Sequence, residues 1–211
     1  MEDFVIIGAG IPPNDDHPQT IIGRNARIRS HTVIYSGNVI GDNFQTGNKA
    51  NIREQNEIGS DVSIGTLTVV EHHVKIGNGV RVHSQAFIPE HTSIGDGAWI
   101  GPHVVITNAK YPNTPSTKKE LKGADIGRGA RIGANSTILP GIKIGEFALI
   151  GAGSVVVNDV PPHSIVYGNP AVHGGWACSC GRPLEVSLSG HLSCSGCGAD
   201  YSFSGDVIKR T

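Results

Sequence analysis

An aliphatic residue recurs every six positions along most of the chain, and this repeat constrains the fold more than any other feature. Between residues 22 and 106, fourteen of the fifteen positions in this register are Ile or Val, with Thr46 as the departure. The register is lost after Ile106 and resumes from Ile126 to Val156. A period of six fits neither the 3.6-residue turn of a helix nor the two-residue alternation of a strand. A repeat of this kind indicates a solenoid of stacked units.

Each hexad is expected to supply one short strand and one corner. The aliphatic residue points inward, and the Gly and Asn or Asp residues that often follow it permit a sharp turn. Three hexads close a triangular coil, and successive coils stack at strand spacing, about 4.8 Å. A narrow prism leaves little room for aromatic rings, which make up only 5% of the residues. The sequence therefore predicts an all-β parallel prism of about seven coils.

The chain divides into three expected parts. We expect an N-terminal cap over residues 1–20, the β-helix over 21–170 with an ejected loop at 107–125, and a separate module over 171–211. The net charge of -1 argues against nucleic acid or a membrane surface as partner, because both attract concentrated basic charge. The acidic N-terminal stretch is not typical of a secretory signal, and no apolar run is long enough to span a bilayer. A cytoplasmic location is the resulting expectation.

The repeat and the closing segment VYGNPA, residues 166–171, resemble the hexapeptide-repeat acyltransferases, which are left-handed parallel β-helices. This resemblance implies left-handed coils, a homotrimer, and acetyl-CoA bound in a groove between adjacent prisms. It also implies that the cofactor contacts lie on the later coils. The residues expected there are Gly133, Ala134, Lys143, Gly151 and Ala152.

Stacking predicts which side chains become neighbours, because residues eighteen apart share a column. One such column contains Glu54, His72, Glu90 and Asn108, with Asn108 at the root of the ejected loop. A carboxylate or a neutral imidazole can hold an amine and take up its proton during attack on a thioester. Asn108 or a corner N–H group can stabilise the oxyanion that develops. We therefore expect His72, Glu90 and Asn108 to be catalytic, with His83 as a competing base.

The type of transfer follows from a second resemblance. The run from NIREQNEIGSDVSIG to WIGPHVVITNAKYP resembles N-acetyltransferases that act on nucleotide-linked amino sugars. In the similar sugar O-acetyltransferases a catalytic histidine stands where this chain has Tyr111, and a phenol is a poor base near neutral pH. Acetylation of an amino group is therefore favoured. The alternatives are sugar O-acetylation, or a non-catalytic β-helix scaffold whose cysteine module recruits partners.

All four cysteines lie close together near the C-terminus, at Cys178, Cys180, Cys194 and Cys197. Two close pairs separated by a short stretch are typical of a four-thiolate zinc site. Disulfides or redox chemistry remain the alternative. Four protein ligands leave no open position for a substrate, so the expected zinc is structural, in a ribbon-like module whose core is too small to fold easily without it.

Overall fold

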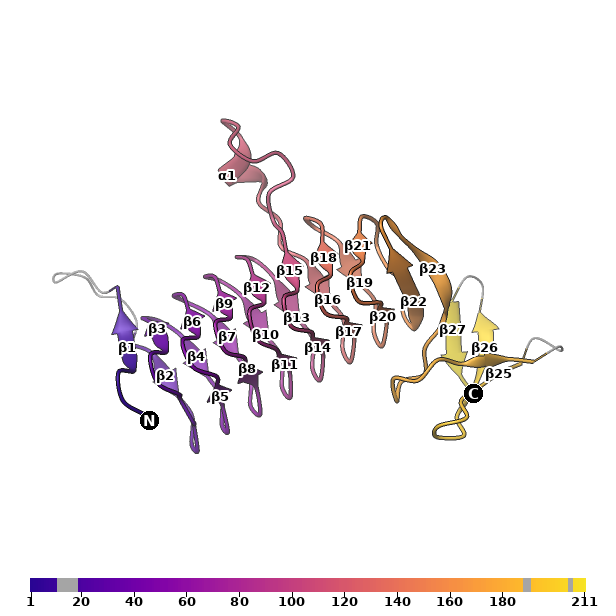
Figure 1. Cartoon of the computed structure of the whole chain (residues 1–211), viewed down its shortest axis with the longest axis horizontal. Helices are drawn as coiled ribbons and strands as arrows, with labels where there is room; N and C mark the ends of the chain where they lie inside the picture. Colours follow the sequence, from indigo (N-terminus) through magenta and orange to yellow (C-terminus); the bar gives the residue numbers. More distant parts are fainter. Residues whose placement is uncertain (11–18, 188–190, 205–206) are drawn as a thin grey trace.

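The computed structural model describes residues 1–10, 19–187, 191–204 and 207–211. It is a long prism with a small sheet at its C-terminal end (Figure 1). Residues 11–18, within the expected N-terminal cap, lie outside the described residues, as do 188–190 and 205–206 of the expected C-terminal module. The described part of the chain contains one short helix, α1 (Thr117–Glu120). None of the described helical structure is long and apolar enough to cross a bilayer.

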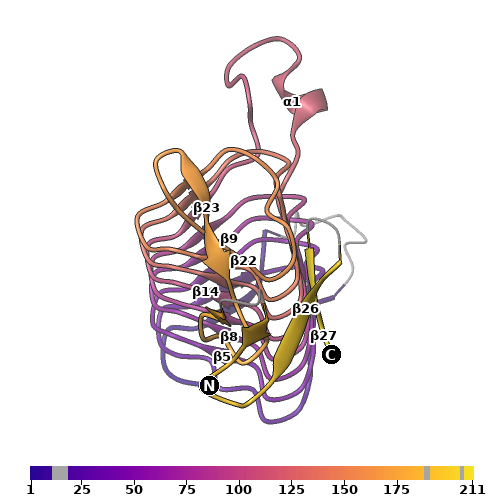
Figure 2. The ribbon, with the colours of Figure 1, turned by 90° about the vertical axis from the view of Figure 1, so that its right-hand side faces the viewer.

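The prism has three faces, each a sheet of stacked short strands, and the end-on view shows the coils lying over one another (Figure 2). Face 1 consists of β1 (Ile6–Ala9), β3 (Val33–Tyr35), β6 (Asn51–Ile52), β9 (Val69–Val70), β12 (Phe87–Ile88), β15 (Val105–Ile106), β18 (Thr137–Ile138) and β21 (Val155–Val156). Face 2 consists of β2 (Ile21–Ile22), β4 (Val39–Ile40), β7 (Glu57–Ile58), β10 (Lys75–Ile76), β13 (Ser93–Ile94), β16 (Asp125–Ile126) and β19 (Lys143–Ile144). Face 3 consists of β5 (Gln45–Thr46), β8 (Ser63–Ile64), β11 (Arg81–Val82), β14 (Trp99–Ile100), β17 (Arg131–Ile132), β20 (Leu149–Ile150), β22 (Ser164–Gly168) and β23 (Ala171–Trp176).

The chain passes from face 1 to face 2 to face 3 and back, so three corners run the length of the prism. We call them the first corner, after the face 1 strands, the second corner, after face 2, and the third corner, after face 3. Neighbouring strands pair in parallel with an eighteen-residue offset, as Val69 does with Phe87. The expected all-β stacked fold is confirmed. Strand β1 and the segment leading into β22 make the stack slightly longer than the repeat alone predicts.

The core is the inward row of aliphatic residues that the repeat predicts. Ile34, Ile64 and Ile100 are 0–1% exposed, and such close packing is the main source of stability in a solenoid. Thr46, the departure from the pattern, is buried but satisfied. Its Oγ1 lies 3.1 Å from Thr32 Oγ1 and accepts a hydrogen bond from the Arg29 N–H. A buried hydroxyl with partners carries little penalty.

The glycines that follow the aliphatic residues have a different purpose from the one expected. A Cβ added at Gly65 would lie 2.3 Å from the backbone N of Ser84 on the next coil. This glycine therefore allows close approach of coils. The left-handed turn residue comes two places later, where Leu67, His73 and Asn43 have positive φ.

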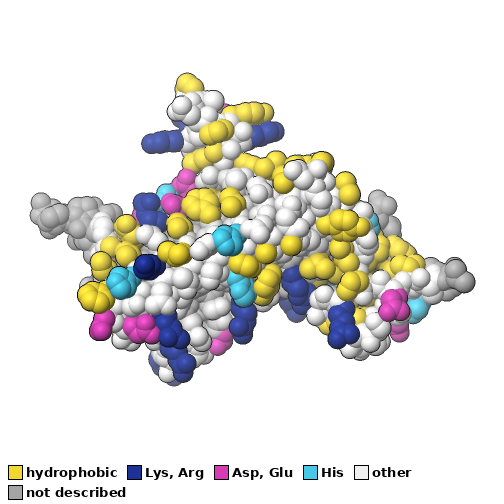
Figure 3. Space-filling model, in the orientation of Figure 1, with side chains coloured by type: hydrophobic (Ala, Val, Ile, Leu, Met, Phe, Trp, Pro, Cys, Tyr) yellow, Lys and Arg dark blue, Asp and Glu magenta, His cyan; other side chains and the backbone are white. Residues whose placement is uncertain are grey.

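The loop at residues 107–125 leaves the prism at the first corner and forms a stalk that carries α1 (Figure 1). Across it, Ser93 pairs with Asp125, 32 residues away instead of eighteen, so the coil keeps its register and the additional residues project. The space-filling view shows this loop standing clear of the prism, with basic and apolar side chains on it (Figure 3). The prediction of an ejected loop is therefore confirmed.

The C-terminal sheet is antiparallel and follows β23, which folds back on β22. Its strands are β24 (Glu185–Val186), β25 (Leu192–Ser193), β26 (Asp200–Ser204) and β27 (Val207–Arg210). A small separate core surrounds the fully buried Tyr201. The Arg131 guanidinium of face 3 donates to Ser179 O and so joins this sheet to the prism.

Candidate active site

The first corner brings three of the four expected catalytic residues together. His72 Nε2 lies 2.9 Å from Glu90 Oε2, and both side chains are partly buried, with 27% and 19% exposed. Asn108 Nδ2 donates to the other Glu90 oxygen at 3.4 Å. The N–H of Lys122 donates to Asn108 O at 2.9 Å, which closes the base of the projecting loop. The column that the repeat predicts is thus assembled where the loop leaves the prism.

Glu54, on the coil before, is committed to a different partner. Arg53 Nε and Nη2 donate to its two oxygens, each at 2.8 Å, and Arg53 also lies 3.4 Å from Glu71. Hydrogen bonds from Arg53 hold the pKa of Glu54 below its ordinary value. His72 was expected to lie between two carboxylates. Its carboxylate contact is Glu90, because the adjacent arginine takes both Glu54 oxygens.

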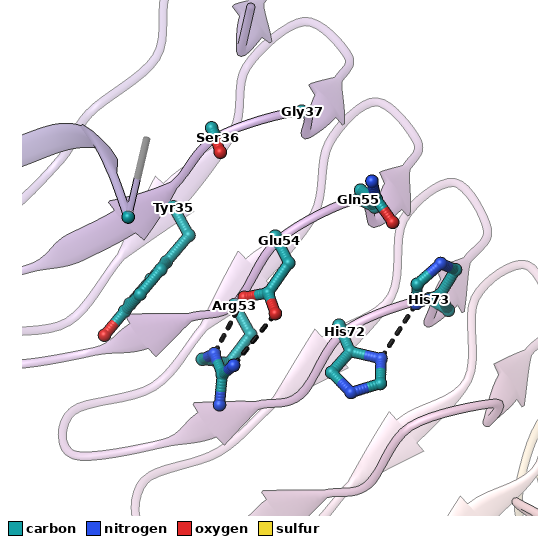
Figure 4. A pocket seen from close by; sticks show the side chains of 9 residues that line it. Tyr35, Ser36, Gly37, Arg53, Glu54, Gln55, His72 and His73 are labelled. Atoms are coloured by element: carbon teal, nitrogen blue, oxygen red, sulfur yellow. Dashed lines mark hydrogen bonds and ion pairs between the residues drawn. The ribbon is translucent and has the colours of Figure 1, made fainter. Parts of the chain in front are cut away.

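A cavity of about 430 Å³ opens beside this column on the N-terminal side. Figure 4 shows Tyr35, the Arg53–Glu54 pair, His72 and His73 lining it from three successive coils. The Arg53 guanidinium lies 5.2 Å from the centre of the Tyr35 ring. The cavity therefore offers an aromatic ring, fixed charges and imidazoles to one ligand, which suits a polar molecule that carries a flat ring.

His83 lies elsewhere. It follows β11 at the third corner, is exposed, and packs against Trp99 with ring centroids 4.6 Å apart. It occupies a column in which Gly65 and Gly101 precede and follow it. Within one chain, the structure therefore does not bring His83 together with the Glu90 carboxylate.

The residues expected to contact acetyl-CoA separate into two places. Gly133, Ala134, Gly151 and Ala152 stack in adjacent coils at the third corner, where a Cβ on Gly133 would lie 2.5 Å from Ala152 N. Lys143 begins β19 on face 2 and is not part of this cluster. Gly133 also borders a groove of about 500 Å³ on face 3, lined further by Trp99, Leu149, Arg81 and Arg131.

The four cysteine sulfurs converge, all lying within 4.8 Å of one another. All four are free thiols. Burial opposes ionisation of Cys178, but hydrogen bonds from Tyr201 and the backbone lower its pKa to about 6. Tetrahedral zinc with bonds of about 2.3 Å requires sulfurs roughly 3.8 Å apart. The separations of 3.5 Å for Cys178–Cys197 and Cys180–Cys194 are close to that value.

Several residues at the first corner were not expected from the sequence. Tyr35 and Arg53 each lie one residue before a position of the column. The eighteen-residue offset relates residues on successive coils, so it does not predict which side chains within one coil contact each other. His73 lies beside His91, with the two ring centroids 5.9 Å apart. Buried Asn38 and Asn56 form a ladder behind the column, in which Asn38 Oδ1 accepts from the Asn56 N–H at 3.0 Å. The visible signal was asparagine at a position where most hexads carry a small or β-branched residue.

Comparison with known proteins agrees with the fold and the repeat. The family described as "Bacterial transferase hexapeptide (six repeats)" matches residues 56–90 and 123–158. The solved structure of the polySia-specific acetyltransferase NeuO superposes with a TM-score of 0.59 and 17% identity, covering 82% of this chain and 87% of that one. At this identity the likeness concerns the fold alone.

Two curated relatives match shorter stretches. The dTDP-3-amino-3,6-dideoxy-alpha-D-galactopyranose 3-N-acetyltransferase of Aneurinibacillus thermoaerophilus is 35% identical over 85 residues, 40% of this chain and 43% of that protein. Serine acetyltransferase 4 of Arabidopsis thaliana is 51% identical over 47 residues, 22% of this chain and 13% of that protein. This chain therefore spans less than half the length of either relative. Over the matched stretches of the prism, the chain is therefore similar to the hexapeptide-repeat family of bacterial transferases.

Proposed function

We propose that this protein transfers an acetyl group from acetyl-CoA to the amino group of a nucleotide-linked amino sugar. The observation that carries the proposal is the Glu90–His72 pair, 2.9 Å apart, at the root of the projecting loop and next to the cavity containing Tyr35 and Arg53. Similarity to the dTDP-amino-sugar N-acetyltransferase over 85 residues supports this choice of acceptor. Tyr35 is suited to stack on a nucleotide base, and the carboxylates are suited to hold an ammonium group.

The reaction is direct attack of the amine on the thioester carbonyl. A carbon–nitrogen bond forms, the carbon–sulfur bond breaks, and the nitrogen loses a proton while the departing thiolate gains one. The first-corner groups orient the amine and accept its proton. The amide of Asn108, together with corner N–H groups, is suited to stabilise the oxyanion. No covalent intermediate on the enzyme is needed.

The donor would bind at the third corner, near Gly133 and Gly151, with the face 3 groove available to the rest of the cofactor. The first and third corners belong to opposite edges of face 1, so donor and acceptor bound to one chain are held apart. Two chains placed side by side would bring a third corner against a first corner. We therefore propose a homotrimer in which each site is shared, with Lys143 contributing from face 2.

The four cysteines are proposed to hold a structural zinc ion. The converging sulfurs support this role, and the thiolates of Cys178, Cys180, Cys194 and Cys197 would be its ligands. The ion would supply no chemistry to the transfer. It would hold together a sheet whose own core is small.

O-acetylation is the second candidate, and the matches to serine acetyltransferases favour it. Tyr111 argues against it, because its side chain is exposed on the loop with the Lys110 ammonium 5.6 Å from the ring. A hydroxyl acceptor needs a stronger base than such a phenol offers near neutral pH. A scaffold without activity is the third candidate.

Thiol release from acetyl-CoA distinguishes the three. The purified protein is incubated with a panel of nucleotide-linked amino sugars, their hydroxyl counterparts, and serine. We expect thiol release only when the acceptor is a nucleotide-linked amino sugar, and we expect mass spectrometry to show an amide in the product. Release with the hydroxyl compounds instead supports O-acetylation, and no release with any acceptor supports the scaffold.

A further inference from the structure

Both ring nitrogens of His72 are engaged inside the protein. Nε2 lies 2.9 Å from Glu90 Oε2, and Nδ1 lies 2.8 Å from Nδ1 of His73. A base must present a free lone pair to the proton that it accepts. His72 has none to offer to a ligand unless one of these contacts breaks.

The contacts define where the protons are when both rings are neutral. An ionised carboxylate only accepts, so His72 Nε2 must carry a proton and donate it to Glu90. A neutral imidazole has one donor and one acceptor nitrogen, so His72 Nδ1 accepts. His73 Nδ1 must then donate, which leaves His73 Nε2 with an unprotonated lone pair. This is the one neutral arrangement that satisfies both hydrogen bonds.

We propose that His73 is the catalytic base that takes the proton from the amine, and that His72 and Glu90 are positioning residues behind it. This inference rests on the proposed function. His73 is exposed, at the rim of the cavity that holds Tyr35 and Arg53. Figure 4 shows the two imidazoles joined by their hydrogen bond at one side of this cavity.

The charges around His73 and His72 favour movement of the accepted proton from His73 toward His72. After His73 Nε2 takes up a proton, its Nδ1 proton can pass to His72 Nδ1, which places the positive charge opposite Glu90. Glu54 is neutralised by Arg53, and Glu71 lies 3.4 Å from the same guanidinium. The ring of His91 lies 6.3 Å from His72 and its Nε2 is 4.0 Å from Glu90. Among the described residues, the carboxylate in ion-pair contact with these rings is thus Glu90.

The step balances without a further reactant. The amine nitrogen bonds to the acetyl carbon, the carbon–sulfur bond breaks, and the proton leaving nitrogen goes to His73 Nε2. The proton is then passed to the departing thiolate, so that the thiol leaves neutral and His73 returns to its starting state. The sum is amine plus thioester giving amide plus thiol.

His73→Asn is the direct test, with Asp61→Asn as its matched control. Both residues are exposed and have similar backbone φ, 56° and 60°, a conformation that asparagine tolerates. Asp61 lies at the second corner, outside the proposed donor and acceptor sites. We expect His73→Asn to lower kcat about 100-fold with little change in KM, as for loss of a general base. Asp61→Asn should behave as wild type.

A second readout does not depend on activity. Long-range ¹H–¹⁵N spectra of the resting protein should show His73 protonated at Nδ1 and bare at Nε2, and His72 protonated at Nε2. The opposite tautomer of His73 would overturn the proposal. If wild type is active and His73→Asn keeps the same rate, the role of His73 is also overturned, but the proposed function stands. A wild type with no amine acetylation would remove both.

Discussion

Two kinds of glycine in the stack are expected to respond differently to substitution, and Gly65 and Gly97 represent them. A Cβ at Gly65 would lie 2.3 Å from Ser84 N, 2.5 Å from His83 C and 2.8 Å from Ser84 Cα. All three are backbone atoms of the next coil, so none can rotate away. At Gly97 nothing lies within 4 Å of the added Cβ, but φ is +66°.

The magnitudes follow from these contacts. Gly65→Ala requires the coils to separate locally by roughly 1 Å, and overpacking of this kind costs about 1–3 kcal/mol. The smaller conformational entropy of the unfolded alanine chain returns about 0.4–1 kcal/mol. We expect a net loss of about 1 kcal/mol. Gly97→Asn should change the free energy of unfolding by about 0.5 kcal/mol or less, because Asn43 and Asn135 already occupy equivalent left-handed positions.

The assay is urea unfolding at one fixed protein concentration, followed by far-ultraviolet circular dichroism, with midpoints and slopes compared. Gly65→Ala should lower the midpoint clearly, and Gly97→Asn should leave it near that of wild type. Equal midpoints for wild type and Gly65→Ala, or a larger loss in Gly97→Asn, would refute the reasoning that close coil contact selects the first glycine.

Three further predictions concern the cysteine sheet, the first corner and the loop. The protein as purified should contain one zinc per chain by elemental analysis. Its removal by a chelator should increase hydrogen exchange in residues 178–210 while the prism stays protected, and equal protection there would contradict a structural ion. Arg53 lowers the pKa of the Glu54 carboxyl. This pair therefore stabilises the fold above the unfolded pKa of about 4.3, and the stabilisation is lost as pH falls through the folded pKa. Titration of the Glu54 carboxyl followed by ¹³C NMR should show a higher pKa in Arg53→Met than in wild type. Replacing residues 109–122 with a short Gly-Ser linker should preserve the circular dichroism spectrum and abolish transfer, whereas retained transfer would remove the loop from the site.

The period of six was enough to predict the architecture, because few structures bury one aliphatic residue per hexad. The same counting predicted that His72, Glu90 and Asn108 share a column, since strand pairing preserves an eighteen-residue offset. It also predicted that the loop would leave at this column.

What the repeat could not predict is which partner each side chain selects within a coil. Glu54 pairs with the adjacent Arg53, and His72 with the adjacent His73. Such contacts depend on rotamers at a corner, and a periodic pattern carries no information about them. His83 was offered as a competing base because its type suited the chemistry, but its position places it at another corner. The prediction for the repeated glycine was also wrong. A glycine required by close approach of two coils and a glycine required by a positive φ look the same in a sequence.

The most direct test of the proposed acetyl-transfer site is a crystal structure with CoA and a nucleotide-linked amino sugar bound together. The account predicts the sugar nitrogen within about 3 Å of His73 Nε2, the base against Tyr35, and the CoA sulfur approaching from the third corner of a neighbouring chain. A nucleotide sugar bound instead on face 3 against Trp99 and Leu149, with the first corner empty, would contradict it.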